Sequence, residues 1–335
     1  MNIHIGTAFS GEIKLSTVLP PSIRLRQIPG STGYGSAGPF GLVLLQQLTG
    51  EESPILHYTL NFTDDREILI SSEEPSIRIQ IALQNSYYYD SKHQGKGALH
   101  ERGIQLNFTP KTEVRVRLHK QQTYNHLSVY YTKDQLLPLR DSFPGLAIFL
   151  DKVEKGEAAR FNEHYCIADT KILALVDAML ECEYKDRVRT LYLDSLAMEL
   201  LLLTLVKMSE DRPGTAGQIS ATEAEQIYRA KETLLMDMGK TFTLPTLAEK
   251  TNLSIYKLNN GFKAIYGMGV MEFLLEARMK KAHQLLSVSE MTIGEISEES
   301  GYSHPHAFSL AFKKYFNYTP AFVQRSNKLH GHSNA

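Results

Sequence analysis

The sequence has no tryptophan, only two cysteines and no apolar run long enough to cross a membrane. Cys166 and Cys182 are too few for a disulfide framework or a cysteine-ligated zinc site, and they indicate a reducing compartment. The most apolar stretch, residues 196–206, is about half the length that a spanning helix needs. The N-terminus lacks a basic segment followed by an apolar core, so we expect no signal peptide. These absences predict a cytoplasmic protein without a membrane partner.

The chain also lacks net charge, with 36 Lys and Arg against 37 Asp and Glu in 335 residues. Overall charge therefore gives no sign of a nucleic-acid partner. The balance differs locally, because the residues after Ser300 include Lys and Arg but no Asp or Glu. With 42% hydrophobic residues the chain can bury sizeable cores, and its length suits two or three domains.

Motifs of the common enzyme classes are missing as well. There is no phosphate-binding loop, no dinucleotide-binding glycine motif before a helix, and no serine or cysteine nucleophile motif. The glycine-rich residues 30–38 lack Gly-Lys-Ser/Thr and a following helix, so we expect a flexible loop there. The histidines between residues 57 and 126 stand singly, whereas a cupin-type metal site carries His-x-His with a nearby Glu. We therefore predict no catalytic residue, no cofactor and no metal ligand.

Residues 1–145 have the alternation of half-buried strands. Apolar and polar residues alternate in 77–83, 114–118 and 127–131, and shorter candidates lie between them. The further candidate strands are residues 55–62, 66–71, 87–89 and 103–108. Many short strands predict a β-barrel or sandwich, a cupin-like sensor domain that could hold one small-molecule effector.

Tyr87 to Tyr89, with Arg78, Arg115 and Arg117, leave two interpretations open. They could line a pocket for an acidic or aromatic effector, or they could be ordinary cross-strand pairs with a solvated arginine face. No effector-binding residue is assigned from the sequence.

Residues 146–208 have a helical pattern and form a predicted dimerisation and linker region. Residues 170–180 and 189–208 each carry a broad apolar face, which includes Leu191 and Val206 in the second segment. These faces can be buried against each other, on the barrel, or on a second subunit, and the last alternative predicts a homodimer. Residues 209–220 are rich in Pro, Gly and polar residues, which indicates a flexible linker.

Residues 292–320 have the pattern of a helix-turn-helix unit. Thr292 and Glu295 are spaced as a capping box, and Gly301 falls where a positive φ would end the first helix. We expect Ser303 to cap the second helix, with Pro305 in its first turn. An inward face is predicted for Phe308, Ala311, Phe312 and Tyr315. Polar and basic side chains then lie outward, as suits a helix that enters a major groove.

A second copy of this pattern lies in residues 247–263, and its turn is one residue shorter. Thr243 can cap its first helix and Ser254 its second. Leu258, Phe262 and Ile265 are predicted to face inward. Between the copies, residues 270–286 form a periodic, amphipathic stretch that predicts one connecting helix.

The two units resemble the DNA-binding domain of the AraC/XylS family of transcription regulators. The resemblance covers about residues 222–326 and rests on LAEKTNLS, GFKAIYG, ARMKKAHQLL, IGEISEESGYS and FSLAFKKYFNYTP. It implies an all-α domain over residues 221–335 that binds double-stranded DNA, and a multidomain α+β chain overall. Residues 173–200 are similar to the siderophore-responsive branch typified by pyochelin-uptake regulators, which implies an iron-chelate effector.

The resemblance also implies roles for side chains on the two second helices. Base-facing positions are Tyr256, Asn259, Asn260, His304, His306 and Ser309. Phosphate-facing positions are Ser254, Lys257, Lys263, Lys313 and Lys314. Many relatives have Arg at the position of Leu310 and a polar residue at that of Pro305, so base contact and a structural role both stay open for Leu310. Arg278 matches a position that pairs internally, and we expect it to be structural.

The sequence therefore predicts a transcription regulator, an activator that forms a dimer and contacts RNA polymerase, controlled by an effector in the N-terminal domain. Two alternatives remain. One is a metal-dependent cupin-type enzyme fused to a DNA-binding domain, and the other is a regulator that responds to no effector.

Overall fold

The computed structural model describes residues 4–7, 11–18, 27–48, 50–120, 122–161, 166–210, 221–236, 238–239, 243–289 and 291–331. The chain divides into two compact units, residues 1–218 and 219–335. Most of the predicted linker, residues 211–220, lies outside the described residues.

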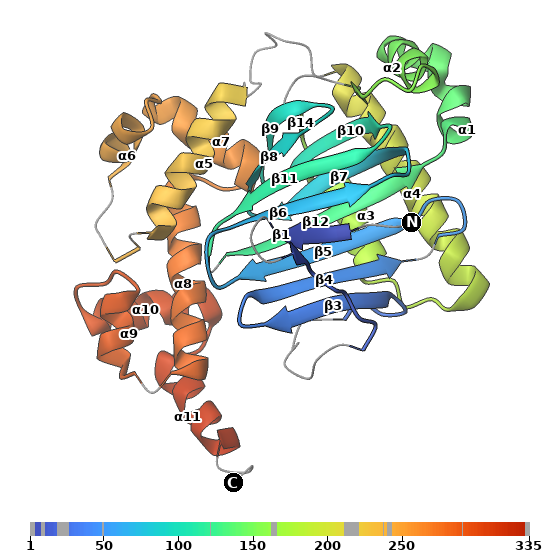
Figure 1. The fold of residues 1–335 in the computed structure, drawn as a ribbon. Coiled ribbons are helices and arrows are strands. Elements are labelled where there is room, and N and C mark those ends of the chain that lie inside the picture. Colours follow the sequence, from blue (N-terminus) through green and yellow to red (C-terminus); the bar gives the residue numbers. More distant parts are fainter. Residues whose placement is uncertain are drawn as a thin grey trace. The chain divides into compact units, whose positions relative to one another are not determined.

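The first unit contains two antiparallel sheets (Figure 1). The smaller sheet has the strand order β2-β1-β6-β11-β8-β9. Its strands are β1 (His4–Thr7), β2 (Gly11–Glu12), β6 (Arg66–Ser72), β8 (Tyr87–Ser91), β9 (Gly95–Leu99) and β11 (Thr112–Leu118). The larger sheet has the order β13-β10-β7-β12-β5-β4-β3, and β14 also pairs with β10. Its strands are β3 (Thr32–Gly38), β4 (Gly41–Leu48), β5 (Ile55–Phe62), β7 (Ser76–Gln84), β10 (Gly103–Thr109), β12 (Thr123–Tyr131), β13 (Ala159–Arg160) and β14 (Cys166–Ile167).

The larger sheet has two covered faces because its strands alternate two sets of side chains. In β7, Ile77, Ile79 and Ile81 belong to the core that this sheet shares with helices. The intervening Arg78 and Gln80 line a cavity on the opposite face. A second core joins that opposite face to the smaller sheet, with Tyr58 and Phe62 from β5 and Ile68 from β6 among its members. The first unit is therefore a β-sandwich with a helical layer on one side.

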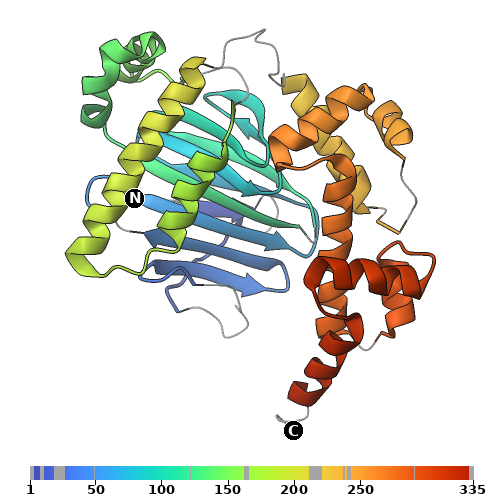
Figure 2. The ribbon, with the colours of Figure 1, turned by 180° about the vertical axis from the view of Figure 1, so that it is seen from behind.

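The helices of the first unit are α1 (Lys133–Leu136), the 3₁₀ helix η1 (Leu137–Ser142), α2 (Pro144–Glu154), α3 (Thr170–Leu180) and α4 (Asp186–Glu210). Figure 2 shows the yellow-green α3 and α4 lying across the larger sheet. Asp169 caps α3, since its carboxylate accepts from the backbone N–H groups of Lys171 and Ile172 at 3.0 Å each. One apolar face of α3 and one of α4 are buried within the chain, in the core that they share with the larger sheet.

The structure adds detail at two places in this unit. Leu191 and Val206, on the apolar face expected for the second helical segment, are 52% and 41% exposed, so neither the sheet nor α3 covers this part of α4. The glycine-rich segment predicted as a flexible loop contains β3, which pairs with β4 along seven residue pairs. Its glycines alternate with Tyr34 and Ser36, and backbone pairing with β4 compensates for their weak strand preference.

The second unit is all-helical. Its helices are α5 (Ala221–Met236), α6 (Leu244–Lys250), α7 (Ile255–Tyr266), α8 (Val270–Val288), α9 (Ile293–Glu299), α10 (Pro305–Phe316) and α11 (Pro320–Gly331). α8 is the predicted connecting helix, and Figure 1 shows it running between the α6–α7 pair and the α9–α10 pair. Across the described residues, no helix is both long and apolar enough to span a bilayer.

Candidate nucleic-acid interface and interior cavity

The first helix-turn-helix unit begins as predicted. The Thr243 hydroxyl accepts from the backbone N–H of Thr246, and the Thr246 hydroxyl accepts from the N–H of Thr243, both at 3.3 Å. After α6, Asn252 adopts a left-handed φ of 55°, which a short polar side chain tolerates. Ser254 then caps α7 by accepting from the N–H of Lys257 at 3.2 Å. Local hydrogen bonds therefore set both helix starts.

α7 has a buried face and an exposed face. Leu258, Phe262 and Ile265 are fully buried, which confirms the predicted inward face. The Phe262 ring lies 5.5 Å from the ring of Phe273 on α8, so aromatic packing fixes α7 against the connecting helix. On the other side Tyr256 is 76% exposed, and Asn260 and Lys263 are also exposed.

Asn259 differs from its exposed neighbours. Its side chain is half-buried, and its Oδ1 accepts a hydrogen bond from the backbone N–H of Val270 at 3.2 Å. This bond satisfies an N–H group in the first turn of α8, whose N-cap residue Gly269 has no side chain to do so. A Cβ on Gly269 would lie only 2.8 Å from Asn259 Oδ1, so this approach depends on glycine. Asn259 thus joins α7 to the start of α8.

Lys257 is also engaged within the second unit. Its Nζ lies 2.6 Å from a carboxylate oxygen of Glu223 on α5, although 60% of the lysine side chain is exposed. An ion pair as exposed as this contributes at most about 1 kcal/mol and can exchange for a phosphate contact. Ser254, beside it, is exposed while its hydroxyl accepts the capping bond.

The downstream helix-turn-helix unit, which contains α9 and α10, also starts at a capping box. Thr292 N–H donates to the Glu295 carboxylate at 2.7 Å, and Glu295 N–H donates to the Thr292 hydroxyl at 3.3 Å. Gly301 has a φ of 79°, as predicted, and a Cβ there would lie 2.3 Å from the Met238 carbonyl oxygen. That carbonyl accepts from Arg278 Nε at 3.0 Å. Arg278 therefore has the structural role expected of it, holding α8 to the segment that follows α5.

The start and the inward face of α10 differ in part from the prediction. His304, not Ser303, is the N-cap residue, and its side chain makes no capping bond. Pro305 at the first helical position explains this, because proline lacks an N–H and disfavours helical geometry in the residue before it. Phe308 and Phe312 are buried as predicted, but Tyr315 is 38% exposed. Tyr315 lies near the end of α10, where its ring turns toward Phe316 at a centroid distance of 4.8 Å.

The outward face of α10 is available to a partner. Its exposed residues are His304, His306, Leu310, Lys313 and Lys314, and Ser309 is half-buried. Phe308 and Phe312 fix this face by packing with Met279, Ala282 and Leu286 of α8. The predicted contacts of both helices with bases and phosphates remain predictions.

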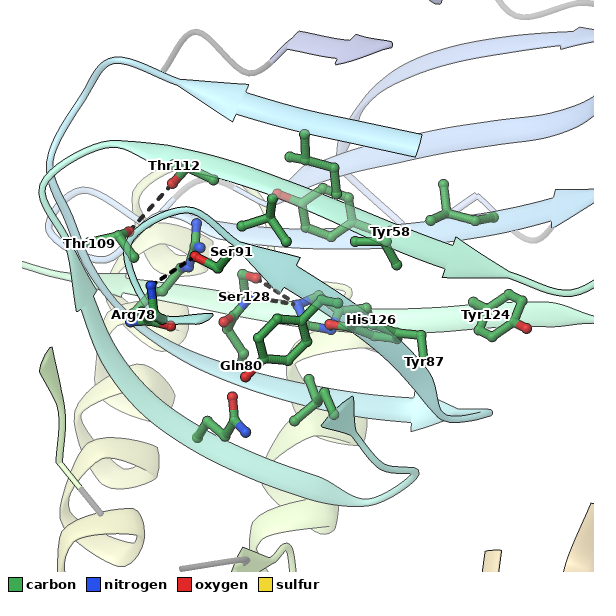
Figure 3. A pocket seen from close by; sticks show the side chains of 18 of the residues that line it. Tyr58, Arg78, Gln80, Tyr87, Ser91, Thr109, Thr112, Tyr124, His126 and Ser128 are labelled. Carbon is green, nitrogen blue, oxygen red and sulfur yellow. Dashed lines mark hydrogen bonds between the residues drawn. The ribbon is translucent and has the colours of Figure 1, made fainter. Parts of the chain in front are cut away.

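The first unit contains a partly open cavity between its two sheets, shown in Figure 3. It has a volume of about 90 Å³ and adjoins a second cavity of about 210 Å³. The residues Tyr58, Ile70, Arg78 and Thr112 line both. The smaller sheet supplies the apolar side chains of Ile70, Val114 and Val116, and polar lining groups come from both sheets. Examples are Ser91 and Thr112 on the smaller sheet and Gln80 and His126 on the larger sheet.

The polar wall is a hydrogen-bonded network centred on His126 of β12. Tyr87 Oη lies 3.0 Å from His126 Nδ1, and Ser128 Oγ lies 3.0 Å from His126 Nε2. Gln80 Nε2 also lies 3.4 Å from His126 Nε2. The Oε1 atom of Gln80 accepts a hydrogen bond from Asn107 Nδ2 at 2.7 Å. Burial, with the positive charge of Arg78 as a smaller cause, lowers the pKa of His126 from 6.5 to about 3. The imidazole is therefore neutral at pH 7.

Arg78 is the cation of this cavity. Its Nε is sealed from solvent without a hydrogen-bond partner, and no ion pair of Arg78 occurs among the described residues. The tyrosine and arginine cluster divides between the cavity and the outer face, and effector binding stays a prediction. Arg78, Tyr87 and Tyr89 line the cavity, whereas Tyr88 is 41% exposed and Arg117 pairs with Glu67 on the outer face.

Sequence reasoning missed His126, Ser128 and Gln80 as cavity residues. A signal was present, because the alternation in β12 and β7 places all three on the faces opposite the apolar residues. Their convergence could not be predicted without the pairing of β7 with β12. Within the described residues, no group of three or more His, Cys, Asp or Glu side chains could hold a metal ion.

Comparisons with known proteins match each of the two compact units to a separate family. Residues 247–326 match a helix-turn-helix domain family, and residues 55–219 match the family of the regulatory protein PchR N-terminal domain. The regulatory protein PchR of Pseudomonas aeruginosa is 31% identical over 129 residues, which are 38% of this chain and 44% of that protein. The chain thus spans less than half of that relative.

The chain is also similar to a transcriptional activator and to one domain of a response regulator. The HTH-type transcriptional activator RhaR of Pectobacterium atrosepticum is 27% identical over 57% of this chain and 68% of that protein. The C-terminal domain of the response regulator yesN from Fusobacterium nucleatum is 33% identical over 29% of this chain and 95% of that domain, with a TM-score of 0.28. The two curated relatives named here are a regulatory protein and a transcriptional activator. The helix-turn-helix match and the N-terminal match confirm the resemblance read from the sequence, and the chain belongs to the AraC family.

Proposed function

We propose that this chain is a sequence-specific, double-stranded-DNA-binding transcription regulator, and an activator, whose first unit binds a small-molecule effector. The observation that carries the DNA-binding proposal is the pair of helix-turn-helix units on one helix. α8 has 19 residues and is about 28 Å long at 1.5 Å per residue. Successive major grooves on one face of a duplex lie about 34 Å apart, so α8 has a suitable length for placing α7 and α10 in both.

The exposed side chains of α7 and α10 support distinct roles in this proposal. Asn260 can accept from and donate to adenine, and Tyr256 can contact a phosphate or a thymine methyl group. His306 and Ser309 would meet base edges from α10, with Leu310 against a thymine methyl. Lys263, Lys313 and Lys314 would contact phosphates and supply salt-dependent affinity. For Asn259 we propose a positioning role instead of base contact, because its oxygen is bonded to Val270.

The effector proposal is supported by the cavity in the first unit. The cavity lies inside a sandwich, has one apolar wall and carries a few convergent polar groups, as ligand sites commonly do. An effector would control DNA affinity by binding one state of the protein better than another. The iron-chelate effector implied by the resemblance remains a prediction.

A homodimer is supported by an exposed apolar row on α4. Val188, Leu191, Leu202 and Val206 are between 38% and 59% exposed on the side of the helix away from the sheet. Two copies of such a row can bury each other across a two-fold axis. The activator role is supported by the similarity to the transcriptional activator RhaR, and contact with RNA polymerase would follow from that role.

Footprinting on DNA from around the gene tests the DNA-binding proposal. We expect two protected patches about one helical turn apart on one face of the duplex, because one α8 separates the two reading helices. The matched control is a double variant, Asn260→Ala with His306→Ala, which should lose the patches while circular dichroism shows an unchanged fold. Failure of the intact chain to protect any segment would refute the proposal.

A further inference from the structure

Arg78 is the unexplained group of the cavity. A guanidinium whose Nε is buried without a partner costs free energy, because water no longer solvates it and no acceptor replaces that water. Arg78 lies within β7, between the buried Ile77 and Ile79, so the strand fixes its backbone and directs its side chain toward the cavity. Arg78 is half-buried, and a cation held in this way, with no ion-pair partner among the described residues, suits an acceptor that arrives from outside the chain.

Hydroxyl groups surround the same end of the cavity. Figure 3 shows Ser91, Thr109 and Thr112 at the end where Arg78 lies. All three side chains are buried and line the cavity. Ser91 Oγ accepts from the backbone N–H of Gln94 at 3.3 Å, so its own hydrogen is left to donate. The Thr109 and Thr112 hydroxyl oxygens lie 3.4 Å apart and form a hydrogen bond with each other. A planar anion bound to Arg78 would find the Ser91 hydroxyl as a further donor.

The remaining walls define the rest of the ligand. The lining also includes Leu60, Val114 and Val116, whose side chains offer no hydrogen bonds. The network around His126 is neutral at pH 7, so it adds no second positive charge. The two adjoining cavities measure about 90 and 210 Å³. Because an apolar cavity of roughly 150 Å³ holds benzene, these volumes suit a ligand with a compact body. The carboxylates near the second cavity, Glu52 and Glu74, are exposed and so lie at its rim.

We propose that the cavity between the two sheets binds a monocarboxylate with a compact apolar or aromatic body, and that Arg78 pairs with its carboxylate. Arg is suited to this role because its planar fork matches a carboxylate with two parallel hydrogen bonds. The apolar body of the ligand would contact Ile70, Val114 and Val116 of the smaller sheet. This inference rests on the proposed effector function, since it names the ligand class for that site.

Calorimetric titration of the intact chain at pH 7 tests the inference with three matched pairs: benzoate and benzamide, 1-naphthoate and 1-naphthamide, octanoate and octanamide. Each amide keeps the shape of its acid and lacks the charge. We expect at least one acid to bind about tenfold or more tightly than its amide, the factor that loss of one good charged contact gives. Equal affinity of acid and amide in every pair, or no binding of any acid at millimolar concentration, would overturn the proposal.

Variants assign the preference to Arg78. Arg78→Gln should remove the preference for the acid and leave amide binding unchanged, whereas Arg78→Lys should keep part of it by keeping the charge. Arg117→Gln is the matched control, because Arg117 is an arginine on the outer face of the same sandwich. A preference that persists in Arg78→Gln would refute the role of Arg78. An acid that binds through Arg78 but leaves DNA protection unchanged would refute the effector role and not the site.

Discussion

Acidification should destabilise the first unit through two buried histidines. Burial lowers the pKa of His57 from 6.5 to about 4, and burial with nearby positive charge lowers that of His126 to about 3. In the unfolded chain both imidazoles take up a proton as the pH falls through 6.5, whereas in the folded chain they stay neutral. The unfolded state then binds more protons, so the free energy of unfolding falls with decreasing pH.

The magnitude follows from the difference between the two pKa values. Between the unfolded value and the folded value each histidine changes the free energy of unfolding by about 1.4 kcal/mol per pH unit. From pH 7 to pH 5 this amounts to about 2 kcal/mol for each histidine. The loss begins near pH 6.5 and ends near the folded pKa, at about 4 for His57 and about 3 for His126.

Urea unfolding at pH 7 and pH 5, followed by circular dichroism, measures this loss. Because carboxylates also titrate, the informative quantity is the difference between the wild type and His126→Gln. We expect the variant to lose about 2 kcal/mol less than the wild type over this interval. His119→Gln is the control, since 56% of that side chain is exposed. If His126→Gln has the same pH dependence as the wild type, the neutral buried imidazole is not the cause.

Three further outcomes are expected in the second unit. Asn260→Ala should weaken binding at one base position by about 1–3 kcal/mol, as measured with operators mutated one position at a time. Lys314→Ala should weaken binding to all sequences alike and lower the slope of log affinity against log salt by roughly one. Gly301→Ala should destabilise the unit by about 1–3 kcal/mol more than Gly267→Ala in thermal unfolding. Both glycines have positive φ, but only the Cβ at Gly301 would meet other atoms, so equal losses would refute the close-approach argument.

Periodicity predicted the elements whose signals are local. α3 and β5 have the predicted bounds, and α8 begins where the apolar repeat begins. The predicted capping box at Thr292 forms, and Thr243 caps α6 as predicted, because these hydrogen bonds join residues three positions apart. Such features depend on a few neighbouring residues, which a sequence displays directly.

Features that depend on distant partners were not predictable in the same way. β3 is held by its pairing with β4 despite its glycines, and the exposed side of α4 is set by which face the larger sheet covers. The cavity needs β7, β8, β11 and β12 to meet, although only the tyrosine and arginine cluster hinted at it. Long-range pairing overrides local preference at these places.

The comparison of α7 with α10 changes where base reading is expected. In α10, Pro305 and Leu310 depart from the family pattern, which by itself would favour α7 as the base-reading helix. In the structure Asn259 bonds to the first turn of α8 and Lys257 pairs with Glu223, so two of the polar side chains of α7 already have partners. On α10, His306 remains exposed, and so do both lysines at its end. Availability of side chains therefore no longer favours α7, and variants of both helices should change operator preference by similar amounts.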